Sequence, residues 1–156
     1  TDQSVAGKVR QALGAGLSPI LCVGETAEER NEGKTIARVR EQVRRLLRGV
    51  PSFSISRCVV AYEPMWAVSQ GIGQPALQPD PKEAAEVMRL IRKVVADQGS
   101  RSFADRLRVV YGGSVEAKTV RPFVEEQGVD GVLVGAASTI PAEFAAIVKT
   151  VAACHS

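Results

Sequence analysis

Several features that would assign the sequence to a membrane, secreted or metal-binding class are missing. No stretch approaches the ~18 consecutive apolar residues of a membrane-spanning helix, and the polar start, residues 1–4, does not resemble a signal peptide. The cysteines are odd in number and lack CxxC or metal-ligand spacing: Cys22, Cys58 and Cys154. This argues against a disulfide framework and a zinc site and favours a reducing, cytoplasmic compartment. We expect Cys22 and Cys58, which lie inside apolar runs, to be small buried hydrophobes.

A strong charge of one sign is missing as well. The sequence has 20 Lys and Arg against 17 Asp and Glu, a net charge of +3. The densest basic cluster also contains Glu41 and consists of Arg38, Arg40, Arg44, Arg45 and Arg48. The spacing of these residues is more typical of the solvent-exposed face of a helix than of a basic surface that binds nucleic acid. We therefore expect neither nucleic acid nor a membrane as a partner, and the sequence indicates no metal and no cofactor.

The chain is long enough for one domain with a real core, which we expect to span residues 1–156. Four short, almost wholly apolar runs indicate strands buried in a parallel sheet: 19–23, 58–62, 107–111 and 129–134. Helical patterns precede and follow them: 4–13, 28–47, 82–95, 118–126 and 143–153. One helix followed by four β-α units predicts an α/β fold, either a doubly wound sheet or a barrel. Periodicity alone does not choose between the two.

The most informative position is Glu63, directly after the run 58–62 and directly before Pro64. Parallel sheets place their chemistry at the carboxyl ends of their strands. The proline removes a backbone donor and biases Glu63 away from helical geometry, so the strand is expected to end there. Glu63 is therefore the first candidate for a reactive group. Glu25, after the run 19–23, is either an acid that supports the reactive group or a helix-start residue that complements the helix dipole, and the second, structural role is favoured.

Two glycine-containing turns follow the last two predicted strands. One is Gly112-Gly113-Ser114 and the other is Gly135-Ala136-Ala137. Glycines let the backbone approach a ligand closely, and a helix start presents free N–H groups to an anion. In barrels a phosphate cradle commonly sits after the last two strands. The pair of turns therefore predicts a phosphate site.

The segment 67–81 has few charges, two glycines and three prolines, and it leaves directly from the candidate reactive residue. A linker would be more polar. The length and position of the segment suggest a lid that closes over a ligand.

Four motifs, in the same order, resemble the triosephosphate isomerase family: 19–25 (Pro-Ile-Leu-Cys-Val-Gly-Glu), 61–67 (Ala-Tyr-Glu-Pro-Met-Trp-Ala), 110–115 (Val-Tyr-Gly-Gly-Ser-Val) and 131–138 (Gly-Val-Leu-Val-Gly-Ala-Ala-Ser). The resemblance covers essentially the whole chain and implies a (β/α)8 TIM barrel. It implies that Glu63 is the base that moves a proton between adjacent carbons of a phosphorylated ketose and aldose. It gives the lid hinge and latch as Pro64, Met65, Trp66 and Tyr111, with Ser114 also in the latch. It gives the phosphate contacts as Ser69, Ser114, Gly135 and Ala136.

The sequence departs from the family pattern in two places. Ala136 replaces the second glycine of the last turn, which is tolerable only if its backbone does not need a positive φ. The lid lacks the family's Gly-x-Gly-Lys core, since Ser69, Gly71 and Ile72 stand there, and it is longer. A longer lid resembles relatives that act on four-carbon tetrulose phosphates.

The resemblance begins in the helix after the family's fourth strand, so it implies the last four β-α units of a barrel plus a leading helix. The family's active-site Asn, Lys and electrophilic His lie on its first and fourth strands, and His155, the one histidine here, matches no catalytic position. Half a barrel leaves sheet edges unpaired. We therefore expect a longer chain or a partner to supply the rest, and the 156-residue segment alone to be inactive.

The resemblance implies a glycolytic and gluconeogenic isomerase of three-carbon sugar phosphates, cytoplasmic and homodimeric. Two alternatives stay open. One is an isomerase of four-carbon tetrulose phosphates, and the other is a non-catalytic half-barrel that binds phosphate.

Overall fold

The structure is a computed structural model that describes residues 2–68, 77–98 and 101–154. Short strands alternate with helices along the chain. The elements are α1 (Asp2–Gly14), β1 (Ile20–Val23), α2 (Ala27–Asn31), α3 (Thr35–Leu46), α4 (Ser52–Ile55), β2 (Val59–Tyr62), η1 (Met65–Ala67), α5 (Pro81–Gln98), α6 (Arg101–Arg106), β3 (Arg108–Tyr111), α7 (Arg121–Val124), η2 (Ala136–Thr139) and α8 (Pro141–Cys154).

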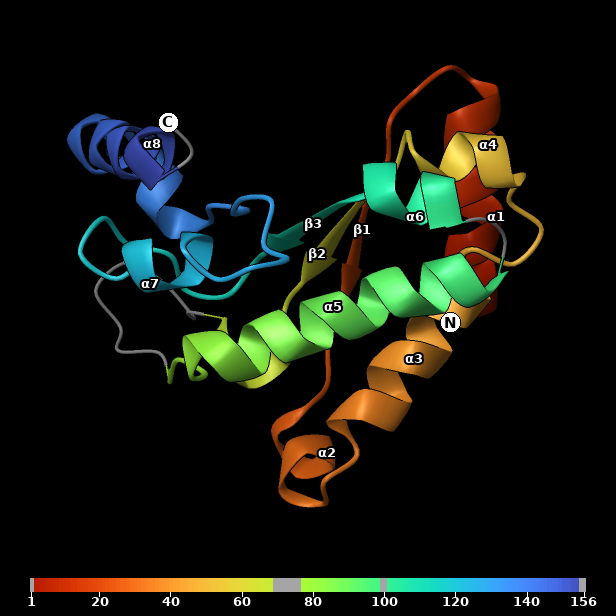
Figure 1. The fold of residues 1–156 in the computed structure, drawn as a ribbon, viewed down its shortest axis with the longest axis horizontal. Helices are drawn as coiled ribbons and strands as arrows, with labels where there is room; N and C mark the ends of the chain where they lie inside the picture. Colours follow the sequence, from red (N-terminus) through yellow and green to blue (C-terminus); the bar gives the residue numbers. More distant parts are fainter. Residues whose placement is uncertain (1, 69–76, 99–100, 155–156) are drawn as a thin grey trace.

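Three parallel strands in the order β1-β2-β3 form the centre of the molecule (Figure 1). The register pairs Val23 with Tyr62 and Tyr62 with Tyr111, so the carboxyl ends of all three strands meet at one edge. These strands confirm the runs predicted at 19–23, 58–62 and 107–111. The residue that follows each strand is thereby placed at the same edge, which is the geometry that an α/β site requires.

The fourth predicted strand, 129–134, is wrong as a full strand. Among the described residues it forms one isolated parallel bridge, between Tyr111 and Val132. Gly131 has a φ of 154°, which interrupts the extended backbone just before the bridge. The segment still runs along β3, because Tyr111 N–H donates to Gly131 O and Leu133 N–H donates to Tyr111 O.

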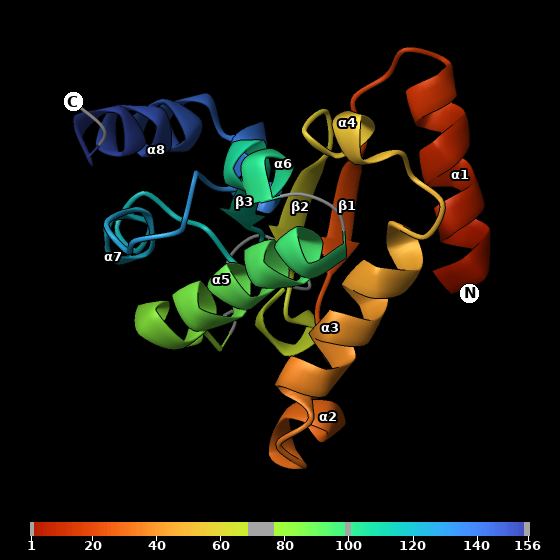
Figure 2. The ribbon, with the colours of Figure 1, turned by 45° about the vertical axis from the view of Figure 1, so that its right-hand side comes forward.

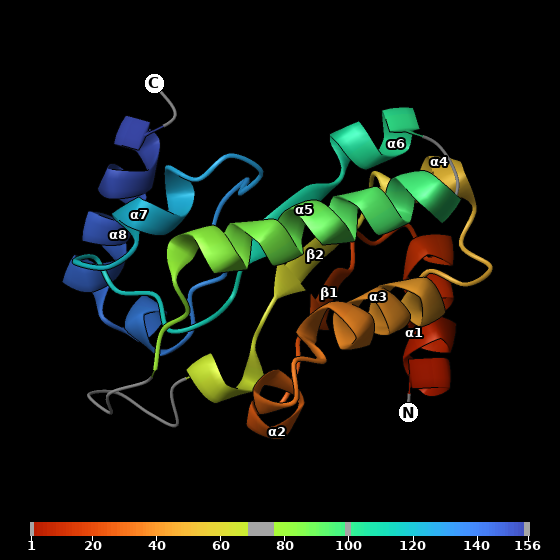
Figure 3. The ribbon, with the colours of Figure 1, turned by 60° about the horizontal axis from the view of Figure 1, so that its bottom comes forward.

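Helices cover one face of the sheet. In Figures 2 and 3, α3 and α5 lie side by side across it. In β1, Leu21 and Val23 are buried beneath them, whereas Ile20 and Cys22 on the other face are exposed. The long helix α5 buries one apolar stripe in the core: Ala84, Ala85, Val87, Met88, Ile91, Val94 and Val95. At about 25 cal/mol per Å² of apolar surface, this stripe is a main source of the core's stability.

Glycine and proline explain where the helices differ from the prediction. The helix expected at 28–47 is two helices, because Gly33 at φ 68° ends α2 and α3 begins at Thr35. The short helix expected at 118–126 is reduced to α7, with Pro122 in its first turn. The helices expected at 4–13, 82–95 and 143–153 are confirmed as α1, α5 and α8.

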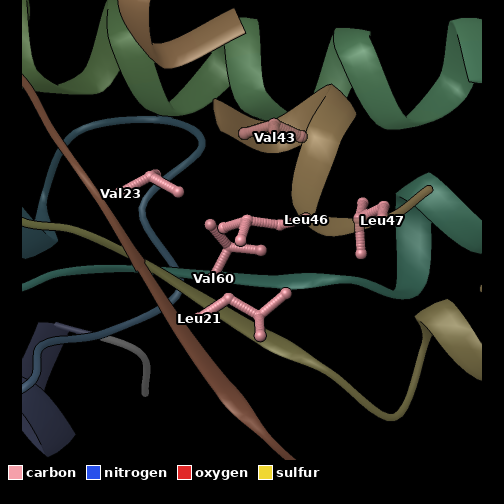
Figure 4. A pocket seen from close by; sticks show the side chains of 6 residues that line it. All are labelled: Leu21, Val23, Val43, Leu46, Leu47 and Val60. Atoms are coloured by element: carbon pink, nitrogen blue, oxygen red, sulfur yellow. The ribbon is translucent and has the colours of Figure 1, made fainter. Parts of the chain in front are cut away.

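A small apolar pocket lies between the sheet and the C-terminal end of α3 (Figure 4). Its lining consists of aliphatic side chains: Leu21, Val23, Val43, Leu46, Leu47 and Val60. It has no room for a water molecule and offers no polar group to a sugar phosphate. It is a small gap in the packing of the core, and Glu63 is not among its lining residues. Within the described part of the chain, no helix has both the length and the apolar character needed to cross a bilayer.

Candidate active site

Glu63 lies at the carboxyl edge of the sheet, where its prediction placed it. It follows β2 directly, and its backbone N–H donates to Val23 O at 2.7 Å. Glycines flank it on both neighbouring strands. A Cβ on Gly24 would stand 1.9 Å from Glu63 O, and a Cβ on Gly112 would stand 2.5 Å from Glu63 Cγ. A larger residue at Gly24 would displace the Glu63 backbone, and one at Gly112 would displace the Glu63 side chain.

Cys22 makes the one side-chain hydrogen bond to Glu63 among the described residues. Its Sγ donates to Glu63 Oε1 at 3.2 Å. Burial, the hydrogen bond and the nearby carboxylate charge raise the pKa of the Cys22 thiol to about 11, in that order of importance. Cys22 is therefore a neutral donor at pH 7.

The prediction that both cysteines are buried is half wrong. Cys58 is buried, but Cys22 is exposed because it lies on the uncovered face of β1. Sequence reasoning also missed its contact with Glu63. The signal was available, because Cys22 pairs with Ala61 and side chains two residues apart on a strand share a face, which puts Glu63 beside it.

Glu25 anchors the turn that follows Glu63. Its side chain is wholly buried and accepts hydrogen bonds from Trp66 Nε1 at 2.8 Å and from Tyr62 Oη at 3.2 Å. Burial, and then the charge of Glu25, raise the pKa of the Tyr62 hydroxyl. The interpretation of Glu25 as a helix-start residue is therefore wrong, since Thr26 caps α2 instead.

The predicted hinge residues form a tight turn around this anchor. Pro64 is buried, Met65 is 63% exposed and Trp66 lies in η1. Met65 N–H donates to Glu25 O. At the end of the turn, Ala67 O accepts from both the backbone N–H and the Oγ of Ser114, each at 2.9 Å. The hinge and the Gly-Gly-Ser turn are thus in direct contact.

Tyr111 is fully buried and stacks on Phe123 with ring centroids 4.2 Å apart. Within the described ranges its hydroxyl has no hydrogen-bond partner. Burial raises the pKa of this hydroxyl, so it stays protonated and able to donate. A buried hydroxyl without a hydrogen-bond partner among the described residues costs free energy.

The second small-residue turn leaves the same sheet edge as the first. Since Tyr111 bridges to Val132, Ser114 and Gly135 each stand three residues beyond the bridged pair. A Cβ on Gly135 would meet nothing within 4 Å, so the space beside it is open. Ala136 opens η2, and no described non-glycine residue has a positive φ, which meets the condition for an alanine there.

One predicted phosphate contact is not placed with these residues. Ser69 lies outside the described residues, as do Gly71 and Ile72. The described ranges contain no cluster of three or more His, Cys, Asp or Glu that could hold a metal ion. The groups that the described site offers for chemistry are therefore a carboxylate, a neutral thiol and backbone N–H donors.

The chain is similar to known proteins along nearly all of its length. The family model described as triosephosphate isomerase matches residues 1–151. Triosephosphate isomerases of Thermoanaerobacter sp. (strain X514) and Caldanaerobacter subterraneus subsp. tengcongensis are each 43% identical to the chain over 149 residues, and that of Clostridium beijerinckii is 38% identical. Each alignment covers 96% of this chain and 58% of the relative. The chain thus spans little more than half the length of these relatives.

Proposed function

The chain belongs to the triosephosphate isomerase family, and from that premise we propose that it supplies the base, lid hinge and phosphate contacts of an isomerase. The reaction is the interconversion of dihydroxyacetone phosphate and glyceraldehyde 3-phosphate. The observation that carries the proposal is Glu63, held at the carboxyl edge of the sheet between Gly24 and Gly112.

Glu63 acts as the general base. Its carboxylate takes a proton from the carbon next to the substrate carbonyl, which gives an enediolate, and returns a proton to the adjacent carbon. The Cys22 thiol donates to Oε1 and so leaves Oε2 as the freer oxygen to take the proton. One substrate carbon is oxidised while its neighbour is reduced, and the two changes balance within the molecule, so the chemistry requires no electron carrier.

The phosphate group is held by backbone donors at Ser69, Ser114, Gly135 and Ala136. In this structure the Ser114 N–H donates to Ala67 O, so this hydrogen bond must break before the N–H can bind the substrate phosphate. Pro64, Met65 and Trp66 move as the hinge, and Tyr111 with Ser114 latches the closed lid. The unpaired Tyr111 hydroxyl supports this, since closure would give it a partner. Closure also excludes water from the reacting enediolate.

The remaining catalytic groups belong to the part of the complete protein that this chain does not span. We propose that an electrophilic His, a Lys and an Asn come from there, that this segment alone is inactive, and that the complete protein is a cytoplasmic homodimer. The uncovered face of β1, where Ile20 is 51% exposed, supports a missing neighbour.

The second candidate function differs from the first in the length of the substrate. The segment between η1 and α5 is longer than the family pattern, which favours an isomerase of four-carbon tetrulose phosphates. The complete protein should be assayed with glyceraldehyde 3-phosphate and with erythrulose phosphates under matched conditions. A higher kcat/KM for the three-carbon substrate supports the proposal, and a clear preference for the tetrulose contradicts it. If the protein binds phosphate but turns over neither substrate, the remaining alternative is the non-catalytic half-barrel that binds phosphate.

A further inference from the structure

One arginine contacts both flanks of the segment that leaves the candidate base. Arg30 lies in the last turn of α2. Its guanidinium carbon is 4.1 Å from the centroid of the Trp66 ring, and its Nη2 is 3.0 Å from Glu83 Oε2. Trp66 follows Glu63 by three residues, whereas Glu83 lies in the first turn of α5, after the lid segment.

The Trp66 ring is therefore fixed from two sides. Its Nε1 donates to the buried Glu25, and its face lies under Arg30. A guanidinium suits this place because it is planar and can stack on an aromatic ring while its N–H groups donate in plane to a carboxylate. A lysine ammonium could not make both contacts with the same geometry.

We propose that Arg30 is a positioning residue that couples the turn at Trp66 to the start of α5, so that the two elements respond to one another. This inference rests on the proposed function, since the position of this turn matters for catalysis only if Glu63 acts on a bound substrate. Glu83 has no described contact with the hinge except through Arg30. Removal of the Glu83 charge should therefore change the hydrogen exchange of the backbone around Trp66.

The contacts of Arg30 with Glu83 and Trp66 are of moderate strength, so they favour one position of the Trp66 turn without locking it. Arg30 and Glu83 keep 38% and 59% of their side-chain surface exposed, which places their pair among partly solvated ion pairs. The loss of such a pair, or of an exposed cation–π contact, corresponds to a population change of about two- to fivefold. We expect effects of that size rather than loss of folding.

The first test is backbone hydrogen exchange in the complete protein, compared between the parent and Glu83→Gln. The peptide that contains residues 63–68 should exchange about two- to fivefold faster in the variant, although Glu83 lies on another element. The matched control is Glu125→Gln, which removes an exposed ion pair with the same 3.0 Å separation, to Arg121. An unchanged exchange rate at 63–68 in Glu83→Gln overturns the inference.

The second test uses Trp66, the one tryptophan of this sequence, as a fluorophore, with Trp66→Phe as the background. Arg30→Met keeps an apolar side chain over the ring but removes both charged contacts. It should shift the Trp66 emission and change kcat/KM for the sugar phosphate by about two- to fivefold, and Arg30→Lys should restore part of both. Equal behaviour of the Met and Lys variants contradicts the coupling role.

Different results would contradict the coupling role of Arg30 and the proposed isomerase function. Faster exchange at 63–68 in Glu83→Gln, in a protein that turns over no sugar phosphate, supports the coupling and contradicts the proposed function. Full isomerase activity with no change at 63–68 supports the function and contradicts the coupling.

Discussion

Gly112 lies directly against the side chain of Glu63, so closely that a Cβ on Gly112 would stand 2.5 Å from Glu63 Cγ and 3.0 Å from Oε1. Its N–H also donates to Tyr62 O, which fixes its backbone to the strand that carries Glu63. The glycine is therefore part of what sets the position of the carboxylate. It acts through shape, without a polar group of its own.

Gly112→Ala should displace the Glu63 carboxylate and lower kcat in the complete protein about a hundredfold, because misplacement of a reacting group by about 1 Å has effects of that order. Steady-state kinetics with a sugar phosphate would measure it. The control is Gly7→Ala, where a Cβ meets nothing within 4 Å and a helical alanine is preferred. It should raise stability slightly and leave kcat unchanged. A Gly112→Ala protein with the parent's kcat would contradict this account of the glycine.

The Cys22 thiol should react slowly with alkylating agents at pH 7 to 8. Thiolate is the reactive form, and the raised pKa of about 11 keeps the thiolate fraction low, so the rate should still be rising at pH 10. Glu63→Gln removes the carboxylate charge but not the burial, so it should lower the pKa of Cys22 and speed alkylation at a fixed pH. Peptide-level mass spectrometry separates Cys22 from Cys58 and Cys154. A slower reaction in Glu63→Gln would contradict the assigned cause.

Glu25→Ala should destabilise the protein by about 2–4 kcal/mol, because the half-buried Trp66 donor and the buried Tyr62 donor would lose their carboxylate acceptor. Denaturant unfolding measures this loss. Glu32→Ala, at an exposed position with a surface ion pair to Lys34, serves as the control and should change stability by less than about 1 kcal/mol. Equal effects of the two substitutions would show that Glu25 does not hold the hinge.

Tyr111→Phe should leave the free energy of unfolding unchanged or slightly higher, since the hydroxyl has no partner in the described part of the chain and the ring stacks on Phe123. If the hydroxyl latches the closed lid, kcat/KM should fall by about tenfold, the change expected from one lost hydrogen bond. Unfolding and kinetics on the same variant separate the two effects. A variant with the parent's kcat/KM would remove Tyr111 from the latch.

Much of the fold was predictable because it depends on local patterns. The run 58–62 is apolar because β2 lies between β1 and β3 in the parallel sheet, and Pro81 and Pro141 are the first residues of α5 and α8. The split of the helix at Gly33 was less visible, because a helical glycine costs only about 1 kcal/mol and does not by itself predict a break.

The site was predictable in position and less so in its contacts. Glu63, Ser114 and Gly135 share a sheet edge because the strands are parallel, which the order of elements already implies. The burial of Glu25 and the exposure of Cys22 were not predictable in the same way. Both depend on which face of the sheet the helices cover, and that is a property of packing between distant segments.

The most direct test of the account is Glu63→Gln in the complete protein, with turnover of glyceraldehyde 3-phosphate and binding of inorganic phosphate measured side by side. The amide keeps the shape of the side chain but cannot take the carbon-bound proton. If Glu63 is the base, kcat should fall about 10²- to 10⁴-fold, the contribution typical of a general base, with phosphate affinity retained. Turnover equal to that of the parent protein would contradict the assignment of Glu63 as the base.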